Sequence, residues 1–290
     1  MILVTTPTGN IGSHVLRNLL DSDERLRVIL RDPARLPPEA RSRVEVVQGS
    51  HEDAGAIDAA MKGVDAVFWL CPPTPRATPE AATTGFTRAG AEAIRRHRVG
   101  HVVAATTLGR GTKWQDRAGM ATASIRMVDL LRETGAAVRG LALPAFMDNA
   151  RLQVSAIRAG AMQGAISPDR KLPHVATRDV GAVGAGLLSD RSWTGQADIP
   201  VLGPEEHSYA DIARIIGEET GRMIRYEQVP FKELAQQIIG VGWPEPFADA
   251  YVAMLRAKDE GMDNAVPRSS AILGPTTFRR WVAEELRLDP

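Results

Sequence analysis

The sequence predicts an α/β fold, a doubly wound parallel sheet with a smaller, mainly helical C-terminal lobe. The first observation behind this prediction is a series of short runs rich in Val, Ile and Leu that barely alternate with polar residues. Such runs are typical of strands covered on both faces. The second is that helical patterns separate these runs through the first half, as in doubly wound sheets. The third is a change to mostly helical patterns beyond residue 203.

Each element of the sheet follows from one apolar run or from the helical pattern behind it. A helix over Ile11–Leu20 is expected because its apolar side chains fall on one face. The other helices of the first half are expected at Ala54–Met61, Thr83–Arg96 and Ala121–Arg132. The expected strands are Ile2–Val4, Arg27–Leu30, Val44–Val47, Ala66–Leu70, His101–Ala105, Val138–Leu143 and, as a seventh, Asp198–Leu202.

The second half changes character. Arg151–Gly164 has a helical pattern, and Val175–Leu188 contains a further helix. Beyond Gly203, a short extended piece at Ile224–Val229 interrupts a series of helices. These helices are expected at Tyr209–Thr220, Phe231–Gly240 and Pro246–Asp259. The C-terminal part is therefore expected to form a lobe that packs on the sheet domain and leaves a cleft between them.

Composition limits the classes of function. The 35 basic and 35 acidic residues give a formal net charge of +0, which favours neither nucleic acid nor an anionic membrane as a partner. The single cysteine, Cys71, excludes an intrachain disulfide and a metal site of several thiolates, and the histidines show no metal-ligand spacing. The chain shows no signal-peptide pattern and no apolar run near the ~20 residues of a membrane span. A cytoplasmic location is expected, and a homodimer is left open.

The strongest motif is Val4–Gly12, which follows the first strand and opens the first helix. Gly9 lets the backbone approach a pyrophosphate, Gly12 lets the helix pack closely on the strand, and the helix N-terminus offers N–H donors to phosphate. Thr6 stands where a Rossmann loop usually has its first glycine, which leaves the phosphate cradle in place. An ordinary strand–helix turn is the alternative, but the βαβ context favours a dinucleotide site. The residues assigned to it here are Thr6, Thr8, Gly9, Asn10, Ile11 and Gly12.

This motif gives the domains their expected roles. Residues 1–150 form the dinucleotide-binding Rossmann domain, and residues 175–203 return to it. Residues 151–174 and 204–290 form the substrate-binding lobe. The end of the second strand decides the cofactor, because NAD-binding sites usually carry a carboxylate there. Here Arg31 could clamp a 2′-phosphate, which favours NADP(H) over NAD(H); the alternative is a solvated arginine paired with Asp32. The other residues assigned to the cofactor follow the later strands: Ser50, Leu70, Cys71, Pro72, Thr106 and Pro144.

An ordered set of segments resembles the NmrA-like family, the atypical short-chain dehydrogenase/reductases. The matching segments are Thr5–Gly12, Val28–Arg35, Val46–Ser50, Gly63–Phe68, Leu143–Asn149, Thr177–Val180 and Leu202–Glu205. The resemblance implies a Rossmann domain that holds NAD(P) and a small C-terminal lobe over the nicotinamide. The family includes quinone and dye reductases, and also regulators that bind the dinucleotide without known turnover.

The sequence departs from the short-chain dehydrogenases at their catalytic pair. Many of them use Tyr-x-x-x-Lys on the helix after the fifth strand, where tyrosine is the proton donor and lysine lowers its pKa. No such pair exists in this chain, and Met120 and Ser124 stand where it is expected. A developing alkoxide needs a proton or an oxyanion hole, so reduction of an ordinary ketone becomes hard. A quinone, an iminium ion or a dye accepts hydride without forming a strongly basic alkoxide.

The sequence therefore favours an NADPH-dependent reductase of an electron-poor small molecule. A regulator that senses NADP(H) and binds a protein partner is the second hypothesis. A dehydratase, epimerase or carbonyl reductase with an unfamiliar acid is the third, and a hydrolase is disfavoured because no Gly-x-Ser-x-Gly motif occurs. The substrate wall is expected from Trp114, Phe146, Met147, Asn149, Trp243 and Phe247. For each aromatic residue the alternative is packing between the lobes. Cys71 is interpreted as a packed residue and His174 as a structural one, and His51 is expected only to border the adenine.

Overall fold

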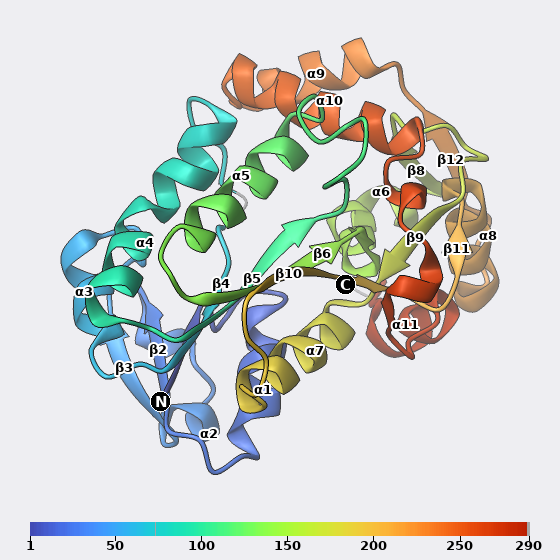
Figure 1. Cartoon of the computed structure of the whole chain (residues 1–290). Helices are drawn as coiled ribbons and strands as arrows, with labels where there is room; N and C mark the ends of the chain where they lie inside the picture. The colour runs from blue at the N-terminus through green and yellow to red at the C-terminus, as the bar shows by residue number, and fades with distance from the viewer. Residues whose placement is uncertain (73, 289–290) are drawn as a thin grey trace.

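The main sheet has eight strands, each parallel to its neighbours (Figure 1). The computed structural model describes residues 1–72 and 74–288. The strands are β1 (Ile2–Thr5), β2 (Leu26–Leu30), β3 (Val44–Gln48), β4 (Ala66–Trp69), β5 (His101–Thr107), β6 (Ala137–Leu143), β10 (Gln196–Leu202) and β13 (Ile272–Leu273). Their order is β13-β10-β6-β5-β4-β1-β2-β3. Six of them repeat the strand order of dinucleotide-binding sheets, so the predicted fold class is confirmed.

Helices cover both faces of this sheet, which is why its central strands are apolar throughout. The helices α1 (Gly12–Leu20) and α7 (Thr177–Ser189) lie on one face, and α3 (Ala54–Met61), α4 (Phe86–His97) and α5 (Met120–Arg132) lie on the other (Figure 1). Successive side chains of a strand point to opposite faces, so Ile2 joins the core under α1 while Leu3 joins the core under α3 and α4. Short segments complete the domain: α2 (Pro38–Arg41), a 3₁₀ turn at Pro33–Arg35 and a π-helical turn at Ala81–Gly85.

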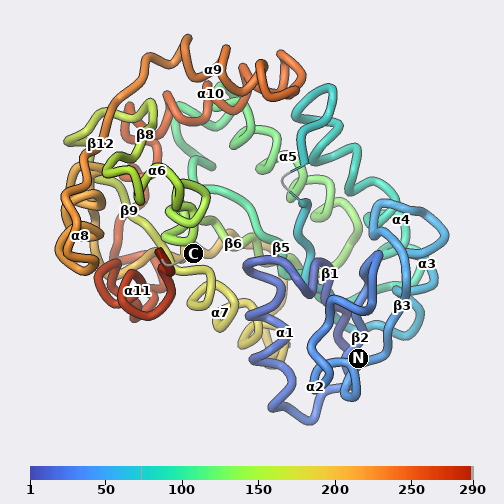
Figure 2. Tube along the Cα trace, turned by 180° about the vertical axis from the view of Figure 1, so that it is seen from behind, coloured from blue at the N-terminus to red at the C-terminus, as the bar shows by residue number. Residues whose placement is uncertain are grey.

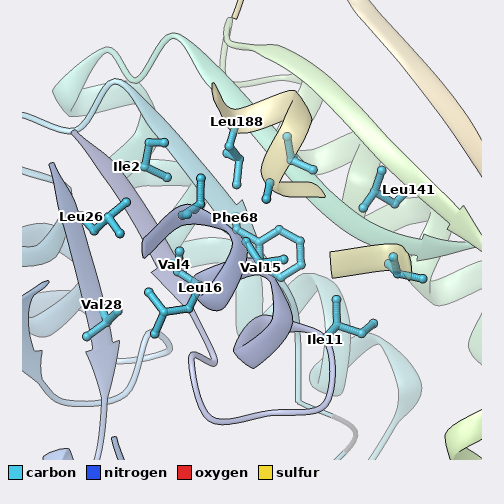
Figure 3. Close-up of a cluster of buried hydrophobic side chains, with 14 of the residues drawn as sticks. Ile2, Val4, Ile11, Val15, Leu16, Leu26, Val28, Phe68, Leu141 and Leu188 are labelled. Carbon is cyan, nitrogen blue, oxygen red and sulfur yellow. The ribbon is translucent and has the colours of Figure 1, made fainter. Parts of the chain in front are cut away.

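The segment around α7 packs directly on α1. A Cβ at Gly181 would lie 2.4 Å from the Cβ of His14, so glycine permits this close approach of the two helices. Figure 3 shows the apolar core beneath them, where Val15 of α1 and Leu188 of α7 lie near Phe68 of β4. Because β10 follows α7 and pairs with β6, residues 177–202 contribute a helix and a strand to the dinucleotide-binding half.

The C-terminal lobe has its own core and two small sheets. Figure 2 shows it to one side of the main sheet, with α9 and α10 lying past α5. Its strands are β7 (Ala145–Phe146), β8 (Ala161–Gly164), β9 (Leu172–Val175), β11 (Glu206–His207) and β12 (Arg225–Gln228). Its helices are α6 (Val154–Arg158), α8 (Tyr209–Thr220), α9 (Phe231–Gly240), α10 (Glu245–Asp259) and α11 (Phe278–Glu285), with 3₁₀ turns at Met147–Gln153, Asp263–Ala265 and Arg268–Ser270. Phe278 and Trp281 of α11 are fully buried in this core.

Two expectations for the second half are wrong. Arg151–Gly164 is not one helix: Gly160 has a φ of +89°, which ends the short α6, and residues 161–164 form β8 beside β12. The pairing with a strand distant in the sequence overrides the local helical pattern. Residues 272–273, expected in the lobe, add β13 to the edge of the main sheet. Among the described residues, no helix combines the length and apolar character needed to cross a membrane.

Candidate functional site

The site lies where β1 and β4 end side by side. The chain leaves these two neighbouring strands in opposite directions along the sheet, and this point is where open α/β sheets bind ligands. The Thr5 hydroxyl joins the two strands there, since it donates to the Phe68 carbonyl at 2.9 Å and accepts from the Leu70 N–H at 3.2 Å. The loops that follow both strands are therefore fixed relative to each other.

The loop after β1 makes the expected tight turn with a threonine in place of glycine. Thr6 has a φ of +52°, in the left-handed region that a β-branched residue rarely adopts. Such a conformation costs roughly 1–3 kcal/mol and persists where the surroundings enforce it. Here the Thr6 carbonyl accepts from the Gly9 N–H at 2.9 Å. A Cβ at Gly12 would lie 2.2 Å from the same carbonyl oxygen, so Gly12 permits α1 to begin directly against the loop.

The loop has the donors that a dinucleotide phosphate requires. The Thr6 hydroxyl is buried and has no hydrogen-bond partner among the described residues. Helix α1 follows, its first turn carries no acidic side chain, and a helix N-terminus favours an anion through its unpaired N–H groups. A bound phosphate would supply the partner that Thr6 lacks. The residues present therefore fit a dinucleotide.

Arg31 stands at the end of β2 with its guanidinium exposed. The alternative pairing with Asp32 is not formed: the Asp32 carboxylate accepts from the Ala34 N–H at 3.0 Å and caps the 3₁₀ turn. Within residues 1–72 and 74–288, no ion pair to the Arg31 side chain is found. Ser50 lies after β3, where its hydroxyl accepts from the Glu52 N–H at 3.3 Å.

A cavity of about 160 Å³ opens at the carboxyl ends of β4 and β5. Four parts of the chain form it: the segment that follows β4, strand β5, helix α5 and helix α10. Its lining is Cys71, Pro72, Thr74, Ala82, Thr83, Ala105, Met120, Ser124, Met127 and Phe247. None of these side chains is a carboxylate, ammonium, guanidinium or imidazole. Met120 and Ser124, the positions at which the Tyr-x-x-x-Lys pair is expected from the sequence, both line this cavity.

The polar side chains of the cavity differ in what they can still bind. The Thr83 hydroxyl donates to the Pro79 carbonyl at 2.8 Å. The Cys71 sulfur lies 3.1 Å from the Thr87 hydroxyl, and burial raises the pKa of this thiol to about 11, so it stays protonated and packed, as the sequence indicates. Ser124 Oγ lies 3.2 Å from Oγ1 of Thr106, near the end of β5.

The expected substrate wall is only partly assembled around the cavity. Phe247 is 3% exposed and lines the cavity, and the ring of Trp243 packs edge-on against it with centroids 5.3 Å apart. Trp114 instead packs beside Met262 in the contact with the lobe, and its indole N–H donates to Glu260 at 2.9 Å. That is the packing alternative stated for this residue.

The segment after β6 also lies away from the cavity lining. Met147 is buried in the core of the lobe, and Phe146 packs against the core beneath α1 and α7. Asn149 is exposed, and Pro144 is buried directly after β6. Asp148, between these residues, accepts from the Thr177 N–H at 3.0 Å, so it ties this segment to the start of α7.

Two histidines singled out in the sequence are buried and neutral. The Nε2 of His51 lies 3.0 Å from the Leu70 carbonyl, and burial lowers the pKa of this imidazole to about 4. His174 is buried in β9 with its Nδ1 3.0 Å from the Leu172 carbonyl, and burial likewise lowers its pKa to about 4. Neither ring lines the cavity.

Sequence reasoning missed the wall formed by Thr74, Ala82 and Thr83. The signal was present, because residues 72–79 hold four prolines directly after a central strand, and a stiff loop at that edge can form one side of a ligand site. The π-helical turn at Ala81–Gly85 is a second signal that only the structure gives, since such turns are frequent at functional sites.

Comparisons with known proteins agree with this geometry. Residues 7–190 match the family described as NAD(P)H-binding. A (4-alkanoyl-5-oxo-2,5-dihydrofuran-3-yl)methyl phosphate reductase of Streptomyces griseus is 29% identical over 294 residues, covering 98% of this chain and 97% of the relative. An NAD(P)H azoreductase of Xenophilus azovorans is 29% identical over 252 residues, covering 86% of this chain and 84% of the relative.

Solved structures share the fold along nearly the whole chain. An NADPH-dependent quinone oxidoreductase of Escherichia coli, solved with NADPH, superposes with a TM-score of 0.80 at 20% identity and covers 98% of this chain and 99% of that one. A mutant NmrA superposes with a TM-score of 0.72 at 16% identity, covering 98% and 94%. These superpositions confirm the fold that the resemblance to the NmrA-like family implies. Because the family match spans more than half of the chain, this chain belongs to the NAD(P)H-binding family.

Proposed function

We propose that this protein uses NADPH to reduce an electron-poor, conjugated small molecule such as a quinone, an imine or iminium compound, or an azo or other dye. One observation carries the proposal: the cavity at the carboxyl ends of β4 and β5 is lined by Met120 and Ser124, where the usual proton-donating pair is expected, and none of the described side chains that line it is charged or an imidazole. The names of the relatives, which specify an azo compound, a quinone and an oxo-dihydrofuran, describe conjugated acceptors and agree with this choice.

The lining determines which acceptors are within reach. When bound, the dinucleotide supplies a hydride, and the protein must orient the acceptor in a site that excludes water. An unactivated ketone would become a strongly basic alkoxide, and losing general acid assistance lowers such a rate by ~10²–10⁴-fold. A conjugated acceptor spreads the new charge over its own framework, so the neutral wall formed by Met120, Met127 and Phe247 is sufficient.

The preference for NADPH rests on Arg31. Its guanidinium is exposed at the end of β2 and carries no ion pair to another described residue. A 2′-phosphate on the ribose at this position would meet a planar donor suited to two parallel hydrogen bonds. Asp32, the nearest carboxylate along the chain, is occupied in capping Ala34 and offers little to a 2′-hydroxyl.

The test is a panel assay on the purified chain. NADPH oxidation is followed by absorbance with 1,4-naphthoquinone, an azo dye, an iminium compound and cyclohexanone, beside a Gly12→Ala variant as the cofactor-deficient control. We expect turnover of at least one conjugated acceptor and a rate for cyclohexanone lower by ~10²-fold or more. Equal rates for cyclohexanone would reveal a proton donor that the proposal denies. Tight NADPH binding without turnover of any acceptor would reject the reductase and leave the alternative, an NADP(H)-sensing protein that binds a protein partner.

A further inference from the structure

Two hydroxyl groups form a pair at the wall of the cavity. Thr106 lies near the end of β5 and is 7% exposed, whereas Ser124 lies on the second turn of α5 and lines the cavity. Their oxygens are 3.2 Å apart, which is a hydrogen-bond distance in which either can be the donor. Strand β5 and helix α5 are both fixed in the sheet domain, so the position of this pair is built into the fold.

Counting hydrogens gives the pair one unused donor. Two hydroxyls carry two hydrogens, and the bond between them uses one. If Thr106, the more buried partner, donates to Ser124, the second hydrogen belongs to Ser124 and points toward the space that Ser124 lines. A ligand oxygen or nitrogen in the cavity would accept a hydrogen bond from this hydroxyl. Without a ligand, the hydroxyl would donate to water.

The other polar side chains of the cavity are less suited to this role. The Thr83 hydroxyl already donates to the Pro79 carbonyl. The Cys71 thiol is held between the Thr87 hydroxyl and the Thr83 carbonyl, and a thiol is a weak donor in any case. Thr74 is exposed, so its hydroxyl is solvated and gains little from a ligand. With Thr106 as the donor of the shared bond, Ser124 is the donor at this wall whose position is fixed by a protein partner and whose hydrogen remains available.

We infer that the Ser124 hydroxyl, held by Thr106, donates a hydrogen bond to the oxygen or nitrogen of an uncharged acceptor and thereby orients it for reduction. This inference rests on the proposed function and names the class of acceptor. Ser124 contacts the acceptor. Thr106, assigned to the cofactor from the sequence, is here a positioning residue that acts through Ser124. A neutral donor in a lining without charged groups selects a neutral acceptor, such as a quinone, over the iminium compounds that the proposed function also admits, because an ionic group placed there would lose its hydration without gaining a partner.

The chemistry balances without a protein acid. The reduced dinucleotide would supply a hydride when bound, so a quinone would gain one hydrogen and two electrons and become the hydroquinone monoanion. The remaining proton would come from bulk water outside the closed site. The hydrogen bond from Ser124 strengthens as negative charge grows on the acceptor oxygen, which is the condition for lowering the barrier.

The experiment measures acceptor binding separately from turnover. Calorimetry on the complex with NADP⁺, which cannot donate hydride, gives the Kd of 1,4-naphthoquinone and of naphthalene, which has the same shape without the oxygens. The variants are Ser124→Ala, Thr106→Val and Thr106→Ser, with the exposed Ser155→Ala on α6 as the matched control. We expect Ser124→Ala to raise the Kd of 1,4-naphthoquinone by ~3–10-fold, the range for one neutral hydrogen bond. The Kd values of naphthalene and NADPH should stay unchanged. Thr106→Val should reproduce this loss and Thr106→Ser should restore binding.

Three results would overturn the inference. One is unchanged 1,4-naphthoquinone affinity in Ser124→Ala. Another is an equal loss for naphthalene, which would mean that the substitution alters the shape of the cavity. The third is weakened NADPH binding with unchanged quinone binding, which would assign the hydroxyl to the cofactor. A selective loss of quinone binding in a protein that shows no turnover would support the contact of Ser124 while rejecting the proposed function, so the two failures are distinguishable.

Discussion

The Gly12→Ala substitution probes the phosphate loop at its tightest point. An alanine Cβ there would lie 2.2 Å from the Thr6 carbonyl oxygen and 2.9 Å from its carbonyl carbon, whereas non-bonded carbon atoms pack at ~3.5–4.0 Å. Both atoms belong to the backbone, so no side-chain rotation relieves the overlap, and the loop or α1 must move by roughly 1 Å. Overpacking of this kind costs about 1–3 kcal/mol. For a chain of this size, that lowers the Tm by roughly 2–10 °C.

Gly9→Ala is the matched control in the same loop. Its Cβ would lie 3.4 Å from the Thr6 oxygen, which is ordinary contact, and the backbone there is not in the left-handed region. We therefore expect the Tm to stay within about 2 °C of the native value. The added methyl nevertheless occupies the space through which a pyrophosphate approaches the backbone, so the Kd for NADPH should rise at least tenfold, which is about 1.4 kcal/mol.

The assay combines thermal unfolding without ligand and fluorescence titration with NADPH. Gly12→Ala should lose both stability and NADPH affinity, and Gly9→Ala should lose affinity alone. A Gly12→Ala protein with native Tm and native affinity would refute the assigned geometry of the loop. A Gly9→Ala protein that binds NADPH normally would show that the phosphates approach elsewhere.

Three further predictions follow from the same structure. Arg31→Ala should raise the Kd of NADPH by roughly 10–100-fold through loss of a charge-assisted contact, while the Kd of NADH changes little. Equal losses of affinity for the two nucleotides in a titration would refute the 2′-phosphate assignment. Phe247→Leu keeps an apolar wall but removes the ring that packs against Trp243. The KM for 1,4-naphthoquinone should therefore rise by roughly 2–10-fold, and the Kd for NADPH should not change. A changed Kd for NADPH with an unchanged KM for 1,4-naphthoquinone would contradict the place of Phe247 in the acceptor cavity. Burial lowers the pKa of His51 and of His174 from 6.5 to about 4, so below roughly pH 6.5 the unfolded chain binds protons first. The free energy of unfolding is therefore highest above that pH and decreases toward pH 4, by about 2 kcal/mol per histidine between roughly pH 7.5 and 5. In urea unfolding, His174→Gln should lose less free energy of unfolding over this range than the native protein. An identical loss would reject the lowered pKa of His174.

The sequence by itself determined the features whose chemistry is local. Apolar runs such as Ile2–Val4 are buried on both faces in a parallel sheet covered by helices. The glycines of the loop at Thr6–Gly12 mark positions where two backbone segments approach closely. The lack of a Tyr-x-x-x-Lys pair is likewise readable without coordinates. These features also determined the fold class, because strand and helix order in this type of sheet follows the order along the chain.

The tertiary structure decided what depends on contacts between distant segments. The helical pattern at Arg151–Gly164 gave way to a strand because β12 offers a partner. Ser124 pairs with Thr106, and Phe247 and Cys71 line the same cavity. In both cases the separation along the chain carries no local signal. Burial is settled in the same way: Trp114 and Phe247 are both aromatic residues outside the predicted strands, yet one packs beside Met262 while the other lines the cavity. The physical reason is that packing sums interactions over the whole fold, whereas the sequence displays only neighbours along the chain.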